Sequence, residues 1–112
     1  MDNTDRWFVS PKKGRVGVVI TTPDREMLKY EVQLKFQATN NEVEYEGILT
    51  GLRVGKALRA KNLLLQSDSK MVIGQIKEEY EVKEERMQKY LRLMKHLTQA
   101  FDRVVFEKIP RS

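Results

Sequence analysis

The sequence predicts an α/β (α+β) fold in which one five-stranded mixed sheet is covered by helices, in the order β-β-β-α-β-α-α-β. From Met27 to Phe36, apolar and polar side chains alternate, which is typical of a strand with one buried face. At Thr39 the spacing of apolar residues changes to that of a helix. The apolar run from Leu63 to Leu65 then indicates a buried strand reached by a crossover. Three antiparallel strands followed by helices and parallel strands therefore build one sheet.

The first third of the chain is expected to form the antiparallel strands. Turn signals separate them: a proline and a glycine flank Lys12 and Lys13, and Thr22-Pro23-Asp24-Arg25 follows the second strand. The alternation is clearest before Phe36, where every second side chain is apolar. The expected strands span residues 6–10, 15–22 and 27–36.

The later elements are indicated by helix-start signals and apolar spacing. Thr39 and Glu42 have the spacing of a capping box, so a helix begins there and continues to about Arg59. Serines on both sides of Asp68 indicate the start of a second helix. An acidic, solvated stretch over residues 78–85 separates it from a third, whose apolar stripe begins at Met87. The remaining strands are expected at residues 62–66 and 103–109.

Composition limits the possible functions. The chain has 112 residues, so we expect a single domain over residues 1–112. Without cysteine and with His96 as the single histidine, the chain excludes disulfides, thiolate metal sites and multi-histidine clusters. Neither a membrane span nor a secretory signal is predicted, so we expect an intracellular protein of the cytoplasm or nucleus. The net charge of +5 favours a nucleic-acid partner.

Two acidic residues stand where a metal or ligand site is expected. Asp68 follows the buried strand, and ligand sites in α/β sheets lie outside the carboxyl ends of parallel strands. Glu44 lies in the first turn of the preceding helix, so the two carboxylates could together hold a hard cation such as Mg²⁺. Each also has a simpler interpretation, Asp68 as the N-cap of the second helix and Glu44 as an acid that favours a helix N-terminus.

The sequences around these acids resemble motifs of a known family. The main segments are ATNNEVEYEG at residues 38–47 and LQSDSK at residues 65–70, with support from residues 17–20, 51–53 and 109–111. Together they are similar to the type-1 RNase H-like domain of plant gypsy-class LTR retroelements, the ribonuclease H associated with reverse transcriptase. The resemblance extends from Trp7 to Pro110. It implies the element order derived above, up to the last helix of that fold.

The resemblance implies a metal-dependent mechanism and a nucleic-acid substrate. In that family, four carboxylates in the order Asp-Glu-Asp-Asp bind two Mg²⁺ ions and cut the RNA strand of an RNA–DNA hybrid. By motif position, Glu44 and Asp68 match the glutamate and the second aspartate, which makes them the expected catalytic and metal-binding residues. The residues expected to contact nucleic acid are Thr39, Asn40, Asn41 and Lys70; the first three match a segment that contacts 2′-hydroxyls.

Two departures from the family pattern predict a loss of activity. Ser10 stands where the first aspartate ends the first strand, and the sequence stops at Ser112, before the segment that carries the fourth. With two of the four carboxylates absent, we expect weak or lost Mg²⁺ binding and a catalytically inactive, retroelement-derived pseudoenzyme. It is still expected to bind RNA–DNA hybrid or duplex RNA, with Lys12 and Lys13 as further phosphate contacts.

Two alternatives stay open. A partner chain could supply the absent carboxylates and complete an active RNA–DNA hybrid endonuclease. The domain could instead be a protein-interaction module, because a fold truncated at its C-terminus lacks the final helix that helps to cover the sheet. An exposed apolar strip, for which Trp7, Val18 and Phe106 are the candidates, would then favour a homodimer or another protein partner.

Overall fold

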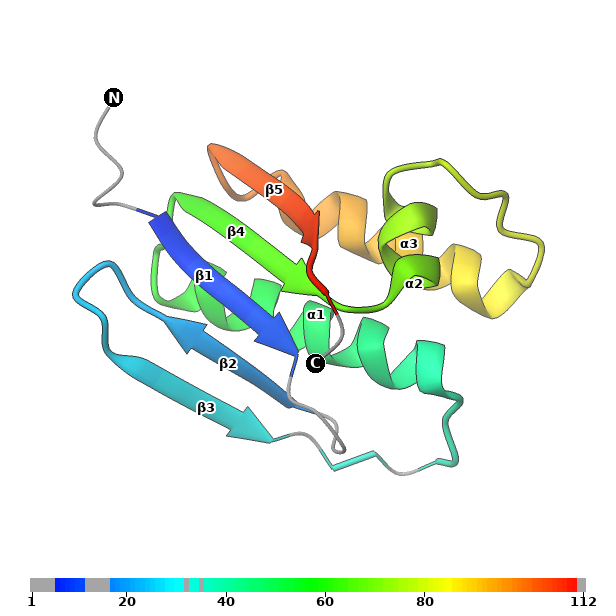
Figure 1. Cartoon of the computed structure of the whole chain (residues 1–112), viewed down its shortest axis with the longest axis horizontal. Coiled ribbons are helices and arrows are strands. Elements are labelled where there is room, and N and C mark those ends of the chain that lie inside the picture. The colour runs from blue at the N-terminus through cyan, green and yellow to red at the C-terminus, as the bar shows by residue number, and fades with distance from the viewer. Residues whose placement is uncertain (1–5, 12–16, 32, 35, 111–112) are drawn as a thin grey trace.

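The computed structural model describes residues 6–11, 17–31, 33–34 and 36–110, and its elements follow the predicted order (Figure 1). The strands are β1 (Arg6–Pro11), β2 (Gly17–Thr21), β3 (Met27–Glu31), β4 (Asn62–Ser67) and β5 (Arg103–Lys108). The helices are α1 (Asn40–Ala57), α2 (Lys70–Ile76) and α3 (Glu85–Thr98). The sheet has the order β3-β2-β1-β4-β5, with β1 antiparallel to β2 and parallel to β4, so the predicted mixed sheet is confirmed.

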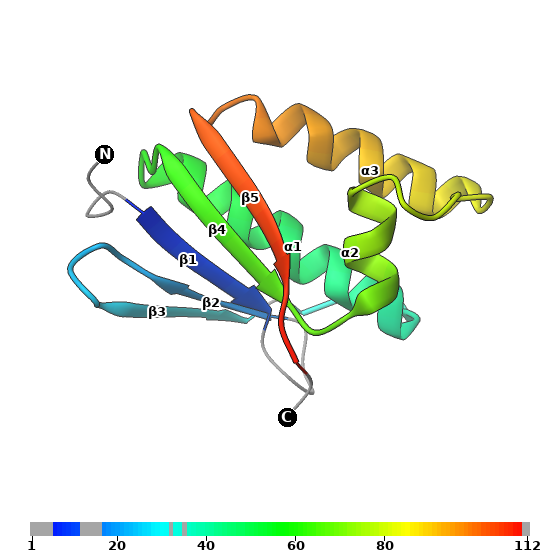
Figure 2. The ribbon, with the colours of Figure 1, turned by 45° about the horizontal axis from the view of Figure 1, so that its top comes forward.

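The helices leave one face of the sheet uncovered. α1 packs on β1 and β2, α2 contacts β5, and α3 lies against α1, so that α1 runs behind the sheet in Figure 1 and below α3 in Figure 2. The side chains of α1 that enter the core recur at helical spacing and are Tyr45, Ile48, Leu49 and Leu52. No helix among the described residues is both long enough and apolar enough to cross a bilayer.

Two elements end earlier than the sequence predicts. β3 spans Met27–Glu31, and residues 33–34 and Phe36, which were expected to continue it, are not part of a strand. α1 ends at Ala57 because Arg59 has a φ of 62°, in the left-handed region, and turns the chain toward β4. The expected start of the second strand, at residue 15, lies outside the described residues.

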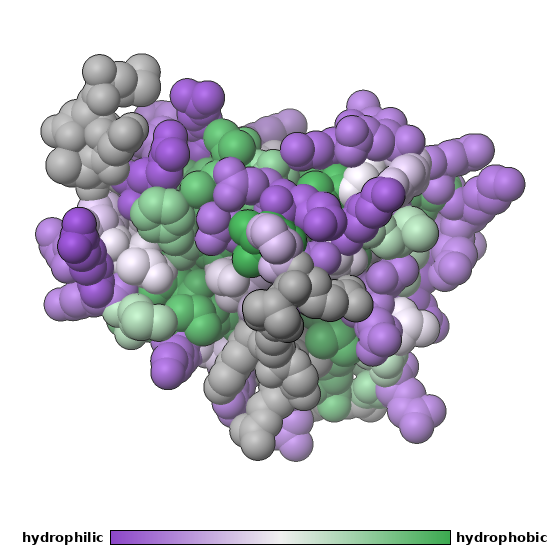
Figure 3. All heavy atoms as spheres, viewed as in Figure 1, coloured by the Kyte–Doolittle hydropathy of each residue, from purple (hydrophilic) through white to green (hydrophobic). Residues whose placement is uncertain are grey.

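An apolar row crosses the open face of the sheet. The strand register places one side chain from each strand side by side, and these are Met27, Thr21, Phe8, Leu64 and Val105. Phe8 is 39% exposed and Met27 is 61% exposed. Figure 3 looks onto this face, where apolar side chains gather over the strands. Phe8 and Met27 are thus the exposed apolar side chains of this row, whereas Leu64 is buried.

The residues that were expected to form an exposed apolar strip lie on the other face. Val18 is fully buried in the core, and Trp7 and Phe106 pack against the same core. The expectation that these three side chains are exposed is wrong. Because strand side chains alternate between faces, an error of one residue in the phase of the pattern moves the whole set to the opposite side.

Glycines allow α1 to lie close to the sheet. A Cβ atom at Gly51 would lie 2.4 Å from Val9 Cγ1 and 3.2 Å from Val18 Cγ2. Both valines are fully buried in the core and have little space into which they could move. At Gly55, one turn later, the nearest atom would be Phe101 Cε1 at 3.4 Å, which is an ordinary contact.

We expect Gly51→Ala and Gly55→Ala to change stability in opposite directions. Gly51→Ala should lower the free energy of unfolding by about 1–3 kcal/mol, because the methyl group overpacks the contact with β1. Gly55→Ala should be neutral or stabilising by up to about 1 kcal/mol, because alanine favours a helix interior. Urea denaturation measures both. Adding Val9→Ala to Gly51→Ala should destabilise less than the sum of the two changes, and strict additivity would contradict this close contact.

Candidate functional site

Ser10, Glu44 and Asp68 line one small cavity of about 80 Å³. Ser10 belongs to β1, Glu44 to α1, and Asp68 directly follows β4. The other residues that form its wall are Pro11, Ser67, Ile109 and Pro110. The fold thus brings together the two acids and the serine that stands at the position expected for an aspartate.

The parallel pairing of β1 with β4 creates this arrangement. Because the two strands run in the same direction, their carboxyl ends, Pro11 and Ser67, lie at the same edge of the sheet. The end of β5 joins them, since the Ile109 N–H donates to the Ser67 carbonyl oxygen at 2.9 Å. The first turns of α1 pass this edge and bring Glu44 to it.

The Ser67 hydroxyl supports the cavity. It donates a hydrogen bond to Glu44 Oε2 at 2.9 Å and accepts one from the Ser69 N–H at 3.1 Å, so one buried hydroxyl holds both the glutamate and the start of α2. Ser69 itself is the N-cap of α2, and its side chain accepts from the Val72 N–H. The simpler interpretation of Asp68 as the N-cap is therefore wrong, and Asp68 faces the cavity from the connection between β4 and α2.

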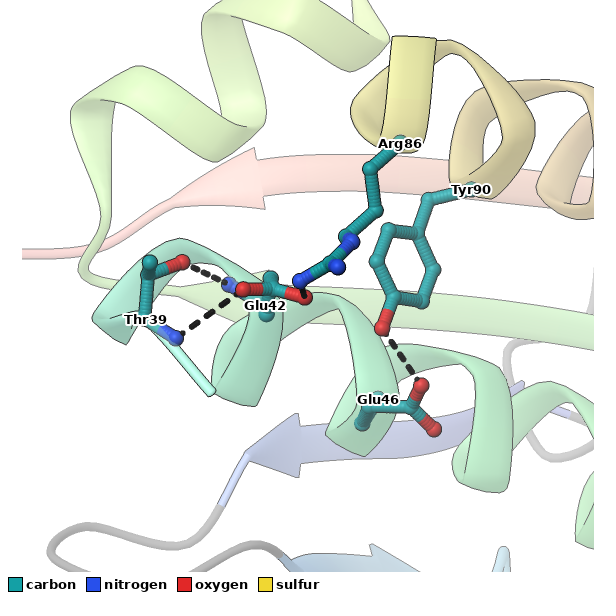
Figure 4. Close-up of polar contacts among 5 residues, drawn as sticks. All are labelled: Thr39, Glu42, Glu46, Arg86 and Tyr90. Carbon is teal, nitrogen blue, oxygen red and sulfur yellow. Dashed lines mark hydrogen bonds and ion pairs between the residues drawn. The ribbon is translucent and has the colours of Figure 1, made fainter. Parts of the chain in front are cut away.

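A capping box shapes the start of α1 (Figure 4). The Thr39 side chain accepts from the Glu42 N–H at 3.2 Å, and Glu42 Oε1 accepts from the Thr39 N–H at 3.1 Å, as the sequence predicts. The Glu42 side chain is only 2% exposed, and Glu42 Oε2 accepts from Arg86 Nη1 at 3.0 Å. The hydrogen bond from the Thr39 backbone, together with Arg86, holds the pKa of Glu42 below its ordinary value although burial opposes it.

The expected nucleic-acid contacts of α1 lie next to the cavity. Asn40 is exposed, and because it precedes Glu44 by four residues, both lie on the same face of the helix. Asn41 is half-buried and lines a second cavity of about 330 Å³ together with Thr39 and Gln75. The turn that carries these amides is therefore continuous with the turn that carries the cavity glutamate.

The expected basic contacts are only partly described. Lys70 is the first residue of α2, is exposed, and follows Asp68 by two residues. Lys12 and Lys13 lie outside the described residues.

The described residues of the cavity supply fewer carboxylates than a two-ion centre needs. Among the described residues, no group of three or more histidine, cysteine, aspartate or glutamate side chains gathers in a way that could hold a metal. Glu44 and Asp68 supply carboxylates, and Ser10 supplies a neutral hydroxyl. This set fits one Mg²⁺ ion that keeps most of its waters, and it does not fit a two-ion centre.

Sequence reasoning missed two supporting groups. Ser67 has a signal in the sequence, since it continues the alternation of Leu63 and Leu65 and so places a hydroxyl on the buried face of β4. The pair of Glu42 with Arg86 has none, because the two residues are 44 positions apart. Both groups hold the N-terminal turns of α1 in place.

Comparison with known proteins identifies the family. The family model described as Reverse transcriptase-like matches residues 3–112. The chain belongs to the reverse transcriptase-like family. This reverse transcriptase-like chain is 31% identical over 104 residues to the bifunctional protein Rv2228c of Mycobacterium tuberculosis, and to the same extent to protein Mb2253c of Mycobacterium bovis. The match covers 92% of this chain and 29% of each relative, so the chain spans less than a third of their length.

Solved RNases H have the same fold as this reverse transcriptase-like domain. The N-terminal RNase H domain of Rv2228c matches with a TM-score of 0.78 at 26% identity, over 95% of this chain and 88% of that one. RNase H1 of Halobacterium salinarum matches with a TM-score of 0.80 at 20% identity, and the match covers 95% of this chain and 86% of that one. LC11-RNase H1, isolated from compost, was solved in complex with RNA/DNA hybrid. It matches with a TM-score of 0.73 at 24% identity, and the match covers 95% of this chain and 85% of that one. The domain is therefore RNase H-like.

Proposed function

We propose that this RNase H-like domain binds RNA–DNA hybrids and that its hydrolytic activity is reduced or lost. The proposal depends on one observation: Ser10 shares a cavity with Glu44 and Asp68 at the carboxyl ends of parallel strands. The cavity has the position of a cation site, but the side chain at the position expected for an aspartate is the neutral hydroxyl of Ser10. Mg²⁺, the ion proposed here, is then held weakly by the two carboxylates, and metal-assisted hydrolysis loses most of its stabilisation.

The start of α1 suits a nucleic-acid strand. The partial positive charge at a helix N-terminus favours a phosphate. Asn40 and Asn41 add neutral amides, which can both donate to and accept from a 2′-hydroxyl, the group that distinguishes RNA from DNA. A related fold, LC11-RNase H1, has been solved in complex with RNA/DNA hybrid, which supports this class of partner.

Titration with labelled RNA–DNA hybrid, duplex RNA and duplex DNA at low salt tests the proposal. We expect hybrid to bind more tightly than duplex DNA. Replacing both Asn40 and Asn41 by alanine should weaken hybrid binding about tenfold, because hydrogen bonds to the sugar are lost. The salt dependence should not change, since no phosphate contact is removed. Asn62→Ala is the matched control, because Asn62 lies at the amino end of β4, away from the cavity, and its loss should leave affinity unchanged.

The same samples, incubated with Mg²⁺ or Mn²⁺, distinguish binding from cutting. We expect little or no cleavage of the hybrid by the wild-type chain. Cleavage that disappears in Glu44→Gln or Asp68→Asn would overturn the proposed loss of activity and establish an endonuclease. The proposed explanation would then be that a partner chain supplies the absent carboxylates. Absence of binding to all three nucleic acids would overturn hybrid binding.

A second candidate function is protein interaction through the open face of the sheet. Phe8 and Met27 are exposed on a face that no described helix covers, and apolar side chains in such a position favour an interface. A homodimer or another protein partner would cover this row. A mass that increases with concentration in light scattering would support the homodimer.

The origin and the location of the protein are also proposals. The motifs of residues 38–47 and 65–70 support descent from a plant gypsy-class retroelement, whereas the relatives named above are mycobacterial. The absence of cysteine is in keeping with an intracellular site in the cytoplasm or nucleus.

A further inference from the structure

We propose that Arg86 of α3 is a positioning residue for the turn of α1 that contacts nucleic acid, an inference that rests on the proposed function. Arg86 Nη1 donates to Glu42 Oε2 at 3.0 Å, and the other oxygen of the same carboxylate accepts from the Thr39 N–H at 3.1 Å (Figure 4). One carboxylate therefore connects α3 to the residue that directly precedes Asn40. The orientation of the two asparagines depends on this connection.

The two side chains of the Arg86–Glu42 ion pair differ strongly in burial. The Glu42 side chain is 2% exposed, whereas Arg86 is 64% exposed. Without Arg86, the hydrogen bond with Thr39 would remain to this buried carboxylate among the described residues. A buried charge that loses its partner favours rearrangement toward water. Lys95 of α3 pairs with Glu78, which follows α2; their side chains are 61% and 72% exposed, so this pair carries no such penalty.

A second contact of α3 strengthens the first. Tyr90 lies one helical turn after Arg86, and its hydroxyl donates to Glu46 Oε2 at 2.6 Å, one turn after Glu42 (Figure 4). The Tyr90 ring also stacks on Tyr45, with centroids 5.4 Å apart and an interplanar angle of 5°. α3 thus holds two successive turns of α1, which fixes both the position and the direction of its N-terminal end.

Positioning and direct phosphate contact predict opposite results for one variant. Glu42→Gln removes a negative charge from a surface that is proposed to meet a polyanion, so electrostatics alone predicts tighter binding of hybrid. If Glu42 instead holds the turn in place through Arg86, the same variant binds hybrid more weakly. The sign of this change distinguishes the two roles.

The experiment measures hybrid affinity of the whole chain for Arg86→Met, Arg86→Lys and Glu42→Gln, with Lys95→Met as the matched control. Lys95→Met removes the same charge from the same helix without touching α1. We expect binding about tenfold weaker for Arg86→Met and Glu42→Gln, as after the loss of a charge-assisted hydrogen bond. Arg86→Lys should recover part of the affinity, and Lys95→Met should change it by less than about twofold.

Amide hydrogen exchange without nucleic acid provides an independent readout. In Arg86→Met, the amides of Glu42 and Val43, which bond to Thr39, should lose protection while those of β4 keep theirs. Unchanged protection at these amides overturns the positioning role. A second pair of results also overturns the positioning role. In Arg86→Met, the salt dependence of hybrid binding would decrease by about one phosphate contact, and Glu42→Gln would bind hybrid more tightly. Arg86 would then contact a phosphate directly. A wild-type chain that binds no hybrid overturns the proposed function instead.

Discussion

Replacing Ser10 with aspartate should give the cavity a measurable affinity for Mg²⁺ and raise hybrid cleavage above the wild-type level. Ser10 shares the cavity with Glu44 and Asp68, so the substitution adds a third carboxylate to the two already there. Without metal, repulsion among the three should lower the free energy of unfolding by about 1 kcal/mol. With Mg²⁺ at about 100 times its dissociation constant, metal binding should raise the free energy of unfolding of this variant by about 2.7 kcal/mol.

Ser10→Asn is the matched control, because its side chain has nearly the same shape as aspartate and no charge. Urea denaturation in Mg²⁺ and in EDTA measures the stabilisation, and a labelled hybrid measures cleavage, for which we expect a gain of at least roughly tenfold. Adding Glu44→Gln to the Ser10→Asp variant should remove both gains. If Mg²⁺ affects Ser10→Asp and Ser10→Asn equally, the three side chains do not act as one site.

Removing the ring of Tyr45 should lower the free energy of unfolding by about 3–5 kcal/mol. The ring is fully buried and stacks on Tyr90, and its hydroxyl donates to Gln75 Oε1 at 2.6 Å. Tyr45 also directly follows Glu44, so the loss of its packing loosens the turn that carries the cavity glutamate. Because small domains are stable by only about 5–15 kcal/mol, Tyr45→Ala should remove much of the total. Urea denaturation measures the change.

Tyr45→Phe keeps the ring and should cost only about 1 kcal/mol, the contribution of one hydrogen bond. It also provides a test by pH, because burial raises the pKa of Tyr45 to about 12 from an ordinary value of 10.0. A raised folded-state pKa stabilises the fold fully below the unfolded value, and this stabilisation is lost as the pH rises through the folded value. Between these two values, the wild type should lose stability more steeply than Tyr45→Phe. Equal slopes would contradict the buried hydroxyl.

Local patterns were sufficient for the order of the elements and for the start of α1. The capping box of Thr39 and Glu42 involves residues three positions apart, and the apolar spacing of α1 repeats within a few turns. Contacts of this kind join residues that are close in sequence, so they can be predicted from residue types and spacing. The parallel course of β1 and β4, which places Ser10 and Asp68 at one edge, follows from the predicted crossover.

The sequence by itself determined the periodicities, the capping box of α1 and the position of Asp68 after a parallel strand. The tertiary structure decided which of the two alternating sets of strand side chains faces α1. It therefore buried Val18 and left Phe8 exposed. It also decided that Arg86 pairs with a glutamate 44 positions away. The alternation of side chains in a strand does not indicate which face of the sheet the helices will cover. A local sequence pattern also contains no information about a contact between residues that are far apart in the sequence.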